Sequence, residues 1–263
     1  MKFPKSLTHG KKPLESRDRI AGLDKGLRIL EAFNDLLPRM TSTQAAQCTG
    51  LSRTAARRYL LTLQELGYVA SDGKIFWLAP RVLRVGWGYF DTARLPRTVL
   101  PYLQRVTGIL DEVALCGVLD GDDVVYVARN GANRVHNVGF VLGARAPASI
   151  SSAGIAIFSC RPVEQVEQWL TGRVFHPYTP YTMTSATEIR GSINHARNHG
   201  YALLEQQLEP GVRGIAVPLK NRYGEVVAAL SVSLTLGKEP RELAVARVVP
   251  TLKEVAHSLL NLL

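Results

Sequence analysis

One short segment carries side chains suited to binding a polyanion. Arg53, Thr54, Arg57 and Arg58 follow Ser52 at spacings that place them on one side of a helix. Guanidinium groups on an exposed helix face can contact phosphates and the base edges of the DNA major groove. This pattern therefore indicates a DNA-binding helix. The alternative is an amphipathic helix with a solvated basic face.

The flanking residues favour the DNA-binding interpretation, because residues 41–66 have the pattern of a helix-turn-helix. Gly50 lies at the turn, where glycine can adopt the positive φ of a helix C-terminus. Ser52 is placed to cap the second helix. The buried stripe expected of that helix is Ala56, Tyr59, Leu60 and Leu63. In a helix-turn-helix the second helix enters the major groove, so we expect Thr43 and Ser52 to lie at the DNA together with the basic residues.

A predicted hairpin follows directly. Residues 67–71 and 74–78 are strand-like and are separated by Asp72 and Gly73. Asp-Gly favours a two-residue turn in which both residues take positive φ. A helix-turn-helix followed by a hairpin predicts a winged helix-turn-helix over residues 20–79, with Lys74 at the wing tip and close to phosphate.

The distribution of charge agrees with a nucleic-acid partner. Residues 1–95 contain 16 Lys and Arg against 8 Asp and Glu, whereas residues 96–263 contain 16 against 14. Most of the net charge of +10 therefore lies in the first third of the chain. Neutralisation of phosphates by basic residues supplies most non-specific affinity for DNA. Residues 1–19 are expected to be a flexible basic arm, which either rests on DNA or has no role.

Composition limits the other classes of function. The 263 residues are enough for two domains, and no apolar run is long enough to span a membrane. Residues 1–19 lack the apolar core of a secretory signal. Cys48, Cys116 and Cys160 lack metal-ligand spacing, so we expect three buried thiols in a cytoplasmic protein. No cofactor or catalytic motif is present, so we expect neither a cofactor nor an enzyme.

The rest of the chain predicts an α+β protein. A first helix is expected over 23–37. An apolar linker helix is expected over 80–94, which packs between domains or against a second subunit; the alternative is burial inside one large core. Residues 95–263 are expected to form a domain with an antiparallel sheet and flanking helices. Its predicted helices are 99–112, 151–159, 163–171, 188–199 and 241–262, and its predicted strands are 113–119, 124–129, 135–142, 201–206, 214–220 and 225–234.

Two features of this second domain suggest a binding pocket. Ser231 and Ser233 fall on one face of a strand, because side chains alternate along a strand with a period of two. Serines on an otherwise apolar face suit a small-molecule pocket, although strand serines also commonly bond backbone or water. Arg134 could hold a carboxylate with two parallel hydrogen bonds. The alternative for Arg134 is a surface position or a salt bridge to Asp122 or Glu205.

Four separated stretches resemble the IclR family of bacterial transcription regulators over almost the whole chain. They are "GLDKGLRILEAF", "TGLSRTAARRYLLTLQELGYV", "WLAPRVLRVGWGYF" and "EPGVRGIAVPLKNRYGEVVAALSVS". Within the family, "VYVARNGANR" and "LLEQQLEPGVRGIAVP" are most similar to the branch that senses protocatechuate and 4-hydroxybenzoate. The resemblance implies a GAF-like effector domain, a homodimer or tetramer, operator DNA as a partner and control of an aromatic-degradation operon.

The resemblance also implies where the effector binds. The implied site residues, beside Arg134, are Ser151, Ser152, Glu205, Gly214, Ser231 and Ser233. Relatives carry a serine or cysteine at the position of Gly214, so this pocket is expected to be roomier. The implied effector is a small aromatic carboxylate such as protocatechuate, 4-hydroxybenzoate or terephthalate.

Two other functions compete with a ligand-gated regulator. The second domain could serve only for oligomerisation, or could sense a non-aromatic acid. The chain could also be an enzyme with an appended DNA-binding module. Release from promoter DNA by a small acid would separate a ligand-gated regulator from a protein whose second domain only oligomerises. Turnover of that acid would reveal an enzyme.

Overall fold

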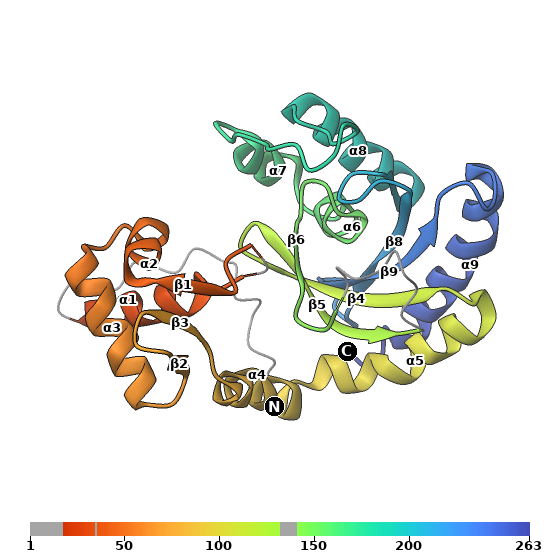
Figure 1. Cartoon of the computed structure of the whole chain (residues 1–263). Coiled ribbons are helices and arrows are strands. Elements are labelled where there is room, and N and C mark those ends of the chain that lie inside the picture. The colour runs from red at the N-terminus through yellow and green to blue at the C-terminus, as the bar shows by residue number, and fades with distance from the viewer. Residues whose placement is uncertain (1–17, 35, 132–140) are drawn as a thin grey trace. The chain divides into compact units, whose positions relative to one another are not determined.

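The computed structural model describes residues 18–34, 36–131 and 141–263 (Figure 1). The chain divides between Thr92 and Ala93 into two units, each with its own core. The first unit combines helices with a three-stranded antiparallel sheet, and the second combines helices with a six-stranded antiparallel sheet. The predicted α+β class is therefore confirmed.

The first unit is a winged helix, as predicted. Its elements are α1 (Ala21–Glu31), β1 (Arg39–Thr41), α2 (Ser42–Thr49), α3 (Arg53–Glu65), β2 (Val69–Ser71) and β3 (Ile75–Leu78). The strands form an antiparallel sheet in the order β1-β3-β2. Ala45 of α2 and Ala56 of α3 are fully buried where the two helices meet. Such small side chains allow the close approach that a helix-turn-helix needs.

Local hydrogen bonds set the ends of these helices. The Thr41 hydroxyl accepts from the Gln44 N–H, while the Gln44 side chain accepts from the Thr41 N–H, which forms a capping box at α2. Gly50 has φ of 69° at the C-terminus of α2. The Ser52 hydroxyl accepts from the Ala55 N–H at 3.2 Å and caps α3, as its sequence position predicts.

The first unit differs from prediction in three details. Helix α1 ends at Glu31 rather than at residue 37, and Ile29 is its fully buried residue, whereas Leu23 is exposed. Strand β1 was not predicted; it pairs with β3. In the wing, Asp72 does not take positive φ. Instead its carboxylate accepts from the N–H groups of Lys74 and of Ile75, the first residue of β3. The pairing of β2 with β3 ends at Ser71 and Phe76, so the turn is wider than two residues.

The linker follows the wing as the 3-10 turn Pro80–Val82 and helix α4 (Leu83–Thr92). None of the residues of α4 is buried within this single chain. Leu83 is 71% exposed and Trp87 is 65% exposed. These large apolar side chains are therefore left on the surface of the single chain.

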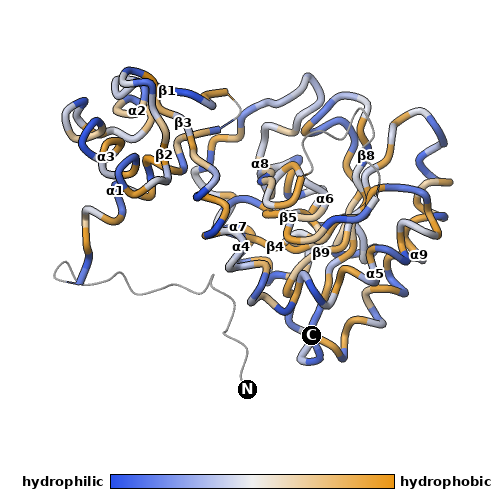
Figure 2. Tube along the Cα trace, turned by 60° about the horizontal axis from the view of Figure 1, so that its bottom comes forward, coloured by the Kyte–Doolittle hydropathy of each residue, from blue (hydrophilic) through white to orange (hydrophobic). Residues whose placement is uncertain are grey.

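The second unit is a six-stranded antiparallel sheet with helices on both faces (Figure 1). Its elements are α5 (Arg94–Leu110), β4 (Val113–Asp120), β5 (Asp123–Asn130), β6 (Arg145–Pro147), α6 (Ser152–Ser159), α7 (Val163–Leu170), α8 (Ala186–His199), β7 (Ala202–Glu205), β8 (Val212–Lys220), β9 (Val226–Thr235) and α9 (Arg241–Leu259). The strand order is β6-β5-β4-β9-β8-β7. The central strands are rich in hydrophobic residues, as Figure 2 shows.

Each face of this sheet has a separate core. Helices α5 and α9 cover one face, where Leu103 and Leu252 are fully buried. Helices α6, α7 and α8 lie over the other, where Phe158 stacks on Trp169 with ring centroids 4.0 Å apart. A sheet covered on both faces explains why β4 and β9 are almost continuously apolar rather than alternating.

Most predicted elements of this unit are present within a few residues. The predicted strand at 135–142 lies largely outside the described residues. Residues 145–147, predicted as loop, form the edge strand β6 instead. The prediction of three buried thiols is wrong for Cys48, which is exposed, whereas Cys116 is buried and Cys160 is intermediate.

Within the described ranges, no helix is long and apolar enough to cross a membrane. The same residues contain no group of three or more His, Cys, Asp or Glu side chains placed to hold a metal ion.

Candidate functional site

The basic side of α3 is exposed. Arg53, Thr54, Arg57 and Arg58 all lie on the surface, while Ala56 on the other side of the helix is fully buried. No ion pair within the described residues neutralises these arginines. Their charges are therefore available to a polyanion, which is the arrangement that a recognition helix requires.

The predicted accessory residues are also exposed. Thr43 lies in the first turn of α2, and Lys74 lies at the tip of the wing. The N–H groups of Ile75 and Lys74 lower the pKa of Asp72, because they donate to its carboxylate. The Asp72 carboxylate is thus held against the backbone of the wing, and the adjacent lysine ammonium is exposed.

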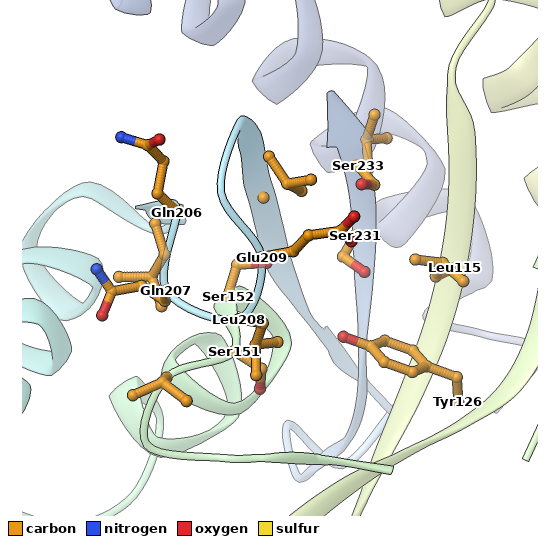
Figure 3. A pocket seen from close by; sticks show the side chains of 15 residues that line it. Leu115, Tyr126, Ser151, Ser152, Gln206, Gln207, Leu208, Glu209, Ser231 and Ser233 are labelled. Atoms are coloured by element: carbon orange, nitrogen blue, oxygen red, sulfur yellow. The ribbon is translucent and has the colours of Figure 1, made fainter. Parts of the chain in front are cut away.

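A pocket lies over the α6 face of the sheet in the second unit (Figure 3). It is lined by Leu115, Tyr126, Ile150, Ser151, Ser152, Leu204, Gln206, Gln207, Leu208, Glu209, Val212, Gly214, Ser231, Val232 and Ser233. The space amounts to about 420 Å³ with its open mouth included. An apolar lining with a few hydroxyls is typical of a site for a small organic molecule.

Five of the predicted effector residues meet in this pocket: Ser151, Ser152, Gly214, Ser231 and Ser233. Helix α6 supplies the first two at its N-terminus, β8 supplies the glycine and β9 the last two. The period of two along β9 brings both serines to the same face, as predicted.

Glu205 is the exception, and its assignment to the pocket is corrected. It pairs across the sheet with Arg213, and the Arg213 guanidinium donates to its carboxylate at 2.7 Å. The neighbouring pair, Leu204 with Gly214, faces the pocket. Because side chains alternate along a strand, Glu205 and Arg213 lie on the opposite face. The buried Arg213 thus uses Glu205 as its counter-ion.

Arg134 lies outside the described residues. The two partners considered for it in a salt bridge are each engaged elsewhere. Asp122 pairs with Arg173 at 2.5 Å and accepts from the Trp169 indole N–H, and these interactions lower the pKa of Asp122. Glu205 pairs with Arg213.

A close approach of strand and helix explains the glycine in the pocket wall. A Cβ atom at Gly214 would lie 2.7 Å from Ser152 Oγ and 3.3 Å from Ser152 Cβ. The first distance is shorter than a van der Waals contact, so a side chain at this position would displace Ser152. Gly214 therefore allows the N-terminus of α6 to lie directly against β8.

The polar groups on the sheet face include one without a partner. Ser231 Oγ is buried and has no hydrogen-bond partner in the described part of the chain. Tyr126 extends from β5 into the same pocket (Figure 3). Burial raises the pKa of Tyr126, so its phenol stays protonated at neutral pH. A buried hydroxyl without a partner costs free energy, which a ligand group could recover.

The segment between β7 and β8 forms a pocket wall that we did not predict. It contributes Gln206, Gln207, Leu208 and Glu209. The Thr182 hydroxyl donates to the Gln207 carbonyl at 2.6 Å, and the Gln207 amide donates to the Tyr181 carbonyl at 2.8 Å. Gln206 has φ of 55°. No local sequence pattern reveals that the distant 179–183 segment supports this wall.

Comparison with known proteins agrees with both units. The model of the IclR helix-turn-helix domain matches residues 22–73. The model described as bacterial transcriptional regulator IclR C-terminal matches residues 88–260. The first match lies within the first unit, and the second begins at residue 88 within α4 and covers most of the second unit.

Individual proteins resemble the whole chain. The Pca operon regulatory protein of Acinetobacter baylyi is 34% identical, over 96% of this chain and 92% of its own. The p-hydroxybenzoate hydroxylase transcriptional activator of the same organism is 36% identical, over 97% and 96%. Among solved structures, a double mutant of the Acinetobacter PobR inducer-binding domain, in complex with 3-hydroxybenzoic acid, is 30% identical. That alignment covers 65% of this chain and all of that one, with a TM-score of 0.61.

Sequence, fold and relatives agree. A winged helix whose helix α3 has an exposed basic side precedes a domain whose pocket holds five of the implied effector residues. Full-length relatives at 34–36% identity are transcription regulators and not enzymes. The chain belongs to the IclR family of bacterial transcription regulators.

Proposed function

We propose that this protein regulates an operon for the catabolism of an aromatic compound and senses a small aromatic carboxylate in the pocket of the second unit. The observation that carries the proposal is the largely apolar pocket on the sheet, which is lined by the buried Ser231, whose hydroxyl has no partner among the residues that the structure describes. Relatives that match nearly the whole chain regulate the pca operon and p-hydroxybenzoate hydroxylase, which supports this ligand class.

The lining suits a substituted aromatic ring. Leu115, Ile150 and Leu204 provide apolar surface for the ring faces. Hydroxyl and carboxylate substituents need polar partners once they leave water. Ser231 can donate to or accept from such a substituent, and the Glu209 carboxylate can accept from a ring hydroxyl.

The proposal is tested with a thermal-shift screen of benzoate, its hydroxy derivatives, protocatechuate and terephthalate, followed by calorimetry. A ligand that binds only the folded state raises the melting temperature. The best ligand should also change the affinity for promoter DNA and should be recovered unchanged. If none of the aromatic acids stabilises the protein, while DNA binding persists, the second unit serves only for assembly or senses a different class of molecule.

We further propose that α3 reads the operator through Arg53 and Arg57, which lie one helical turn apart on its exposed side. Arg53→Ala and Arg57→Ala should each lose roughly 1–3 kcal/mol of operator affinity, because a bidentate base contact is worth about that much. Thr43, Ser52, Thr54 and Arg58 are the proposed neighbouring contacts. Fluorescence anisotropy with promoter fragments measures these losses.

Two controls separate base reading from general charge. Arg28→Ala removes an arginine of α1 that already pairs with Asp24 at 3.2 Å, and should leave operator affinity nearly unchanged. Lys74→Ala should weaken binding to all sequences alike and reduce the salt slope by about 1. Operator affinity that is unchanged in the Arg53→Ala, Arg57→Ala double variant would disprove the role of α3.

A further inference from the structure

Arg129 on β5 has two guanidinium nitrogens without a partner. Its Nη1 donates to the Gly131 carbonyl at 3.2 Å. Nε and Nη2 are buried and have no hydrogen-bond partner within the described residues. Arg129 as a whole is half-buried, so it is these two N–H donors that are withdrawn from water without an acceptor among the described residues.

The two unused nitrogens form a matched pair. Nε–H and one N–H of Nη2 point in parallel from the same side of the planar guanidinium. This is one of the edges with which arginine binds both oxygens of a carboxylate. The bond from Nη1 to Gly131 leaves that edge available and fixes the plane of the group.

Strand register places Arg129 beside the pocket. Leu115 on β4 pairs with Arg129 on one side and with Ser231 on β9 on the other. Directly paired residues project to the same face of a sheet. Leu115 and Ser231 both line the pocket, so Arg129 belongs to the same face. Neighbouring strands are about 4.8 Å apart, so the Cα atoms of Arg129 and Ser231 are separated by roughly 10 Å. Arg129 itself lies outside the pocket lining, so the acid group of a ligand has to extend past Leu115 toward β5 to meet its guanidinium.

The charges on the two sides of the pocket differ in sign. Glu209 belongs to the connection between β7 and β8, whereas Arg129 lies on β5, at the other side of β4 and β9. A carboxylate next to Glu209 would meet a like charge, and one next to Arg129 would meet an opposite charge. An aromatic acid that carries a ring hydroxyl would therefore be oriented with its carboxylate toward β5.

We propose that Arg129 is the carboxylate-binding residue of the effector pocket, holding both acid oxygens through Nε and Nη2, with Ser231 as the adjacent neutral contact. This inference rests on the proposed function, and it specifies the selectivity of that pocket. The pocket binds the carboxylic acid in preference to the neutral amide of the same ring. Arg129 would thus have the carboxylate-binding role that the sequence suggested for Arg134.

The test compares two ligands of the same shape, 4-hydroxybenzoate and 4-hydroxybenzamide, by calorimetry on the full-length protein. The wild type should prefer the acid. Arg129→Met retains much of the apolar stem but lacks the guanidinium. It should bind the acid about 10- to 100-fold more weakly and the amide nearly as well, since a hydrogen bond to a charged group is worth more than a neutral one. Arg129→Lys keeps the charge without the fork and should fall between them.

Matched variants make each outcome decisive. Arg145→Met removes an exposed arginine of the neighbouring strand that is paired with Asp120 and Asp123, and should leave the preference unchanged. The assignment would be overturned if Arg129→Lys or Arg129→Met kept the full preference for the acid. It would also be overturned if only Arg134→Met lost that preference. Either result would leave the proposed function standing. Should the wild type bind neither ligand nor any related aromatic acid, both proposals fail together. If Arg129→Met does not fold, as judged by circular dichroism, the Lys variant alone decides.

Discussion

At the scale of single residues, the contact between Gly214 and Ser152 controls the size of the pocket. Because a Cβ at position 214 would lie 2.7 Å from Ser152 Oγ, Gly214→Ala forces this side chain to move. We expect Gly214→Ala to cost roughly 1–3 kcal/mol in stability or effector affinity, as overpacking does. Adding Ser152→Gly removes the obstructing atoms and should restore most of that loss. Melting curves and calorimetry of the single and double variants measure the coupling; additive effects would show that this contact is unimportant.

At the scale of elements, the wall between β7 and β8 depends on a hydroxyl from a distant segment. Thr182 Oγ1 donates to the Gln207 carbonyl and accepts from the Thr179 N–H at 2.8 Å. Thr182→Val keeps the shape but leaves these groups unpaired, which should cost about 1–3 kcal/mol of stability. Effector affinity should fall while operator affinity in the absence of ligand is retained. Thr171→Val, where the hydroxyl only caps its own helix, is the control; equal losses in both variants would contradict a specific role for Thr182.

At the scale of the whole molecule, we predict a homodimer or tetramer. One winged helix reads only a short half-site, so specific recognition calls for a two-fold partner. Leu83, Trp87 and Phe90 recur along one side of α4, and none is buried in the single chain. Leu83→Ser with Trp87→Ser should dissociate the assembly in sedimentation experiments and weaken operator binding. Leu243→Ser removes another exposed leucine, on α9, and should do neither. A wild-type monomer at micromolar concentration that binds its operator tightly would contradict this prediction.

Local chemistry made the winged helix predictable from sequence. The positive φ of Gly50 and the cap at Ser52 depend on a few neighbouring residues, so their consequences can be worked out without the rest of the fold. The same applies to Ser231 and Ser233, because the period of a strand alone places them on one face. Strand β1 escaped prediction, since its three residues become a strand only by pairing with β3.

Partnerships between distant segments were decided by the tertiary structure alone. Glu205 was expected in the pocket but faces the other side of the sheet, where Arg213 neutralises it. Nothing near Arg129 in the sequence distinguishes it from the other arginines. Only the register of β5, β4 and β9 brings it to the face of the sheet that carries Leu115. Two of its nitrogens have no partner there among the described residues. Periodicity along a strand is a property of the local chain, whereas strand order and the pairing of buried charges depend on which segments meet when the chain folds.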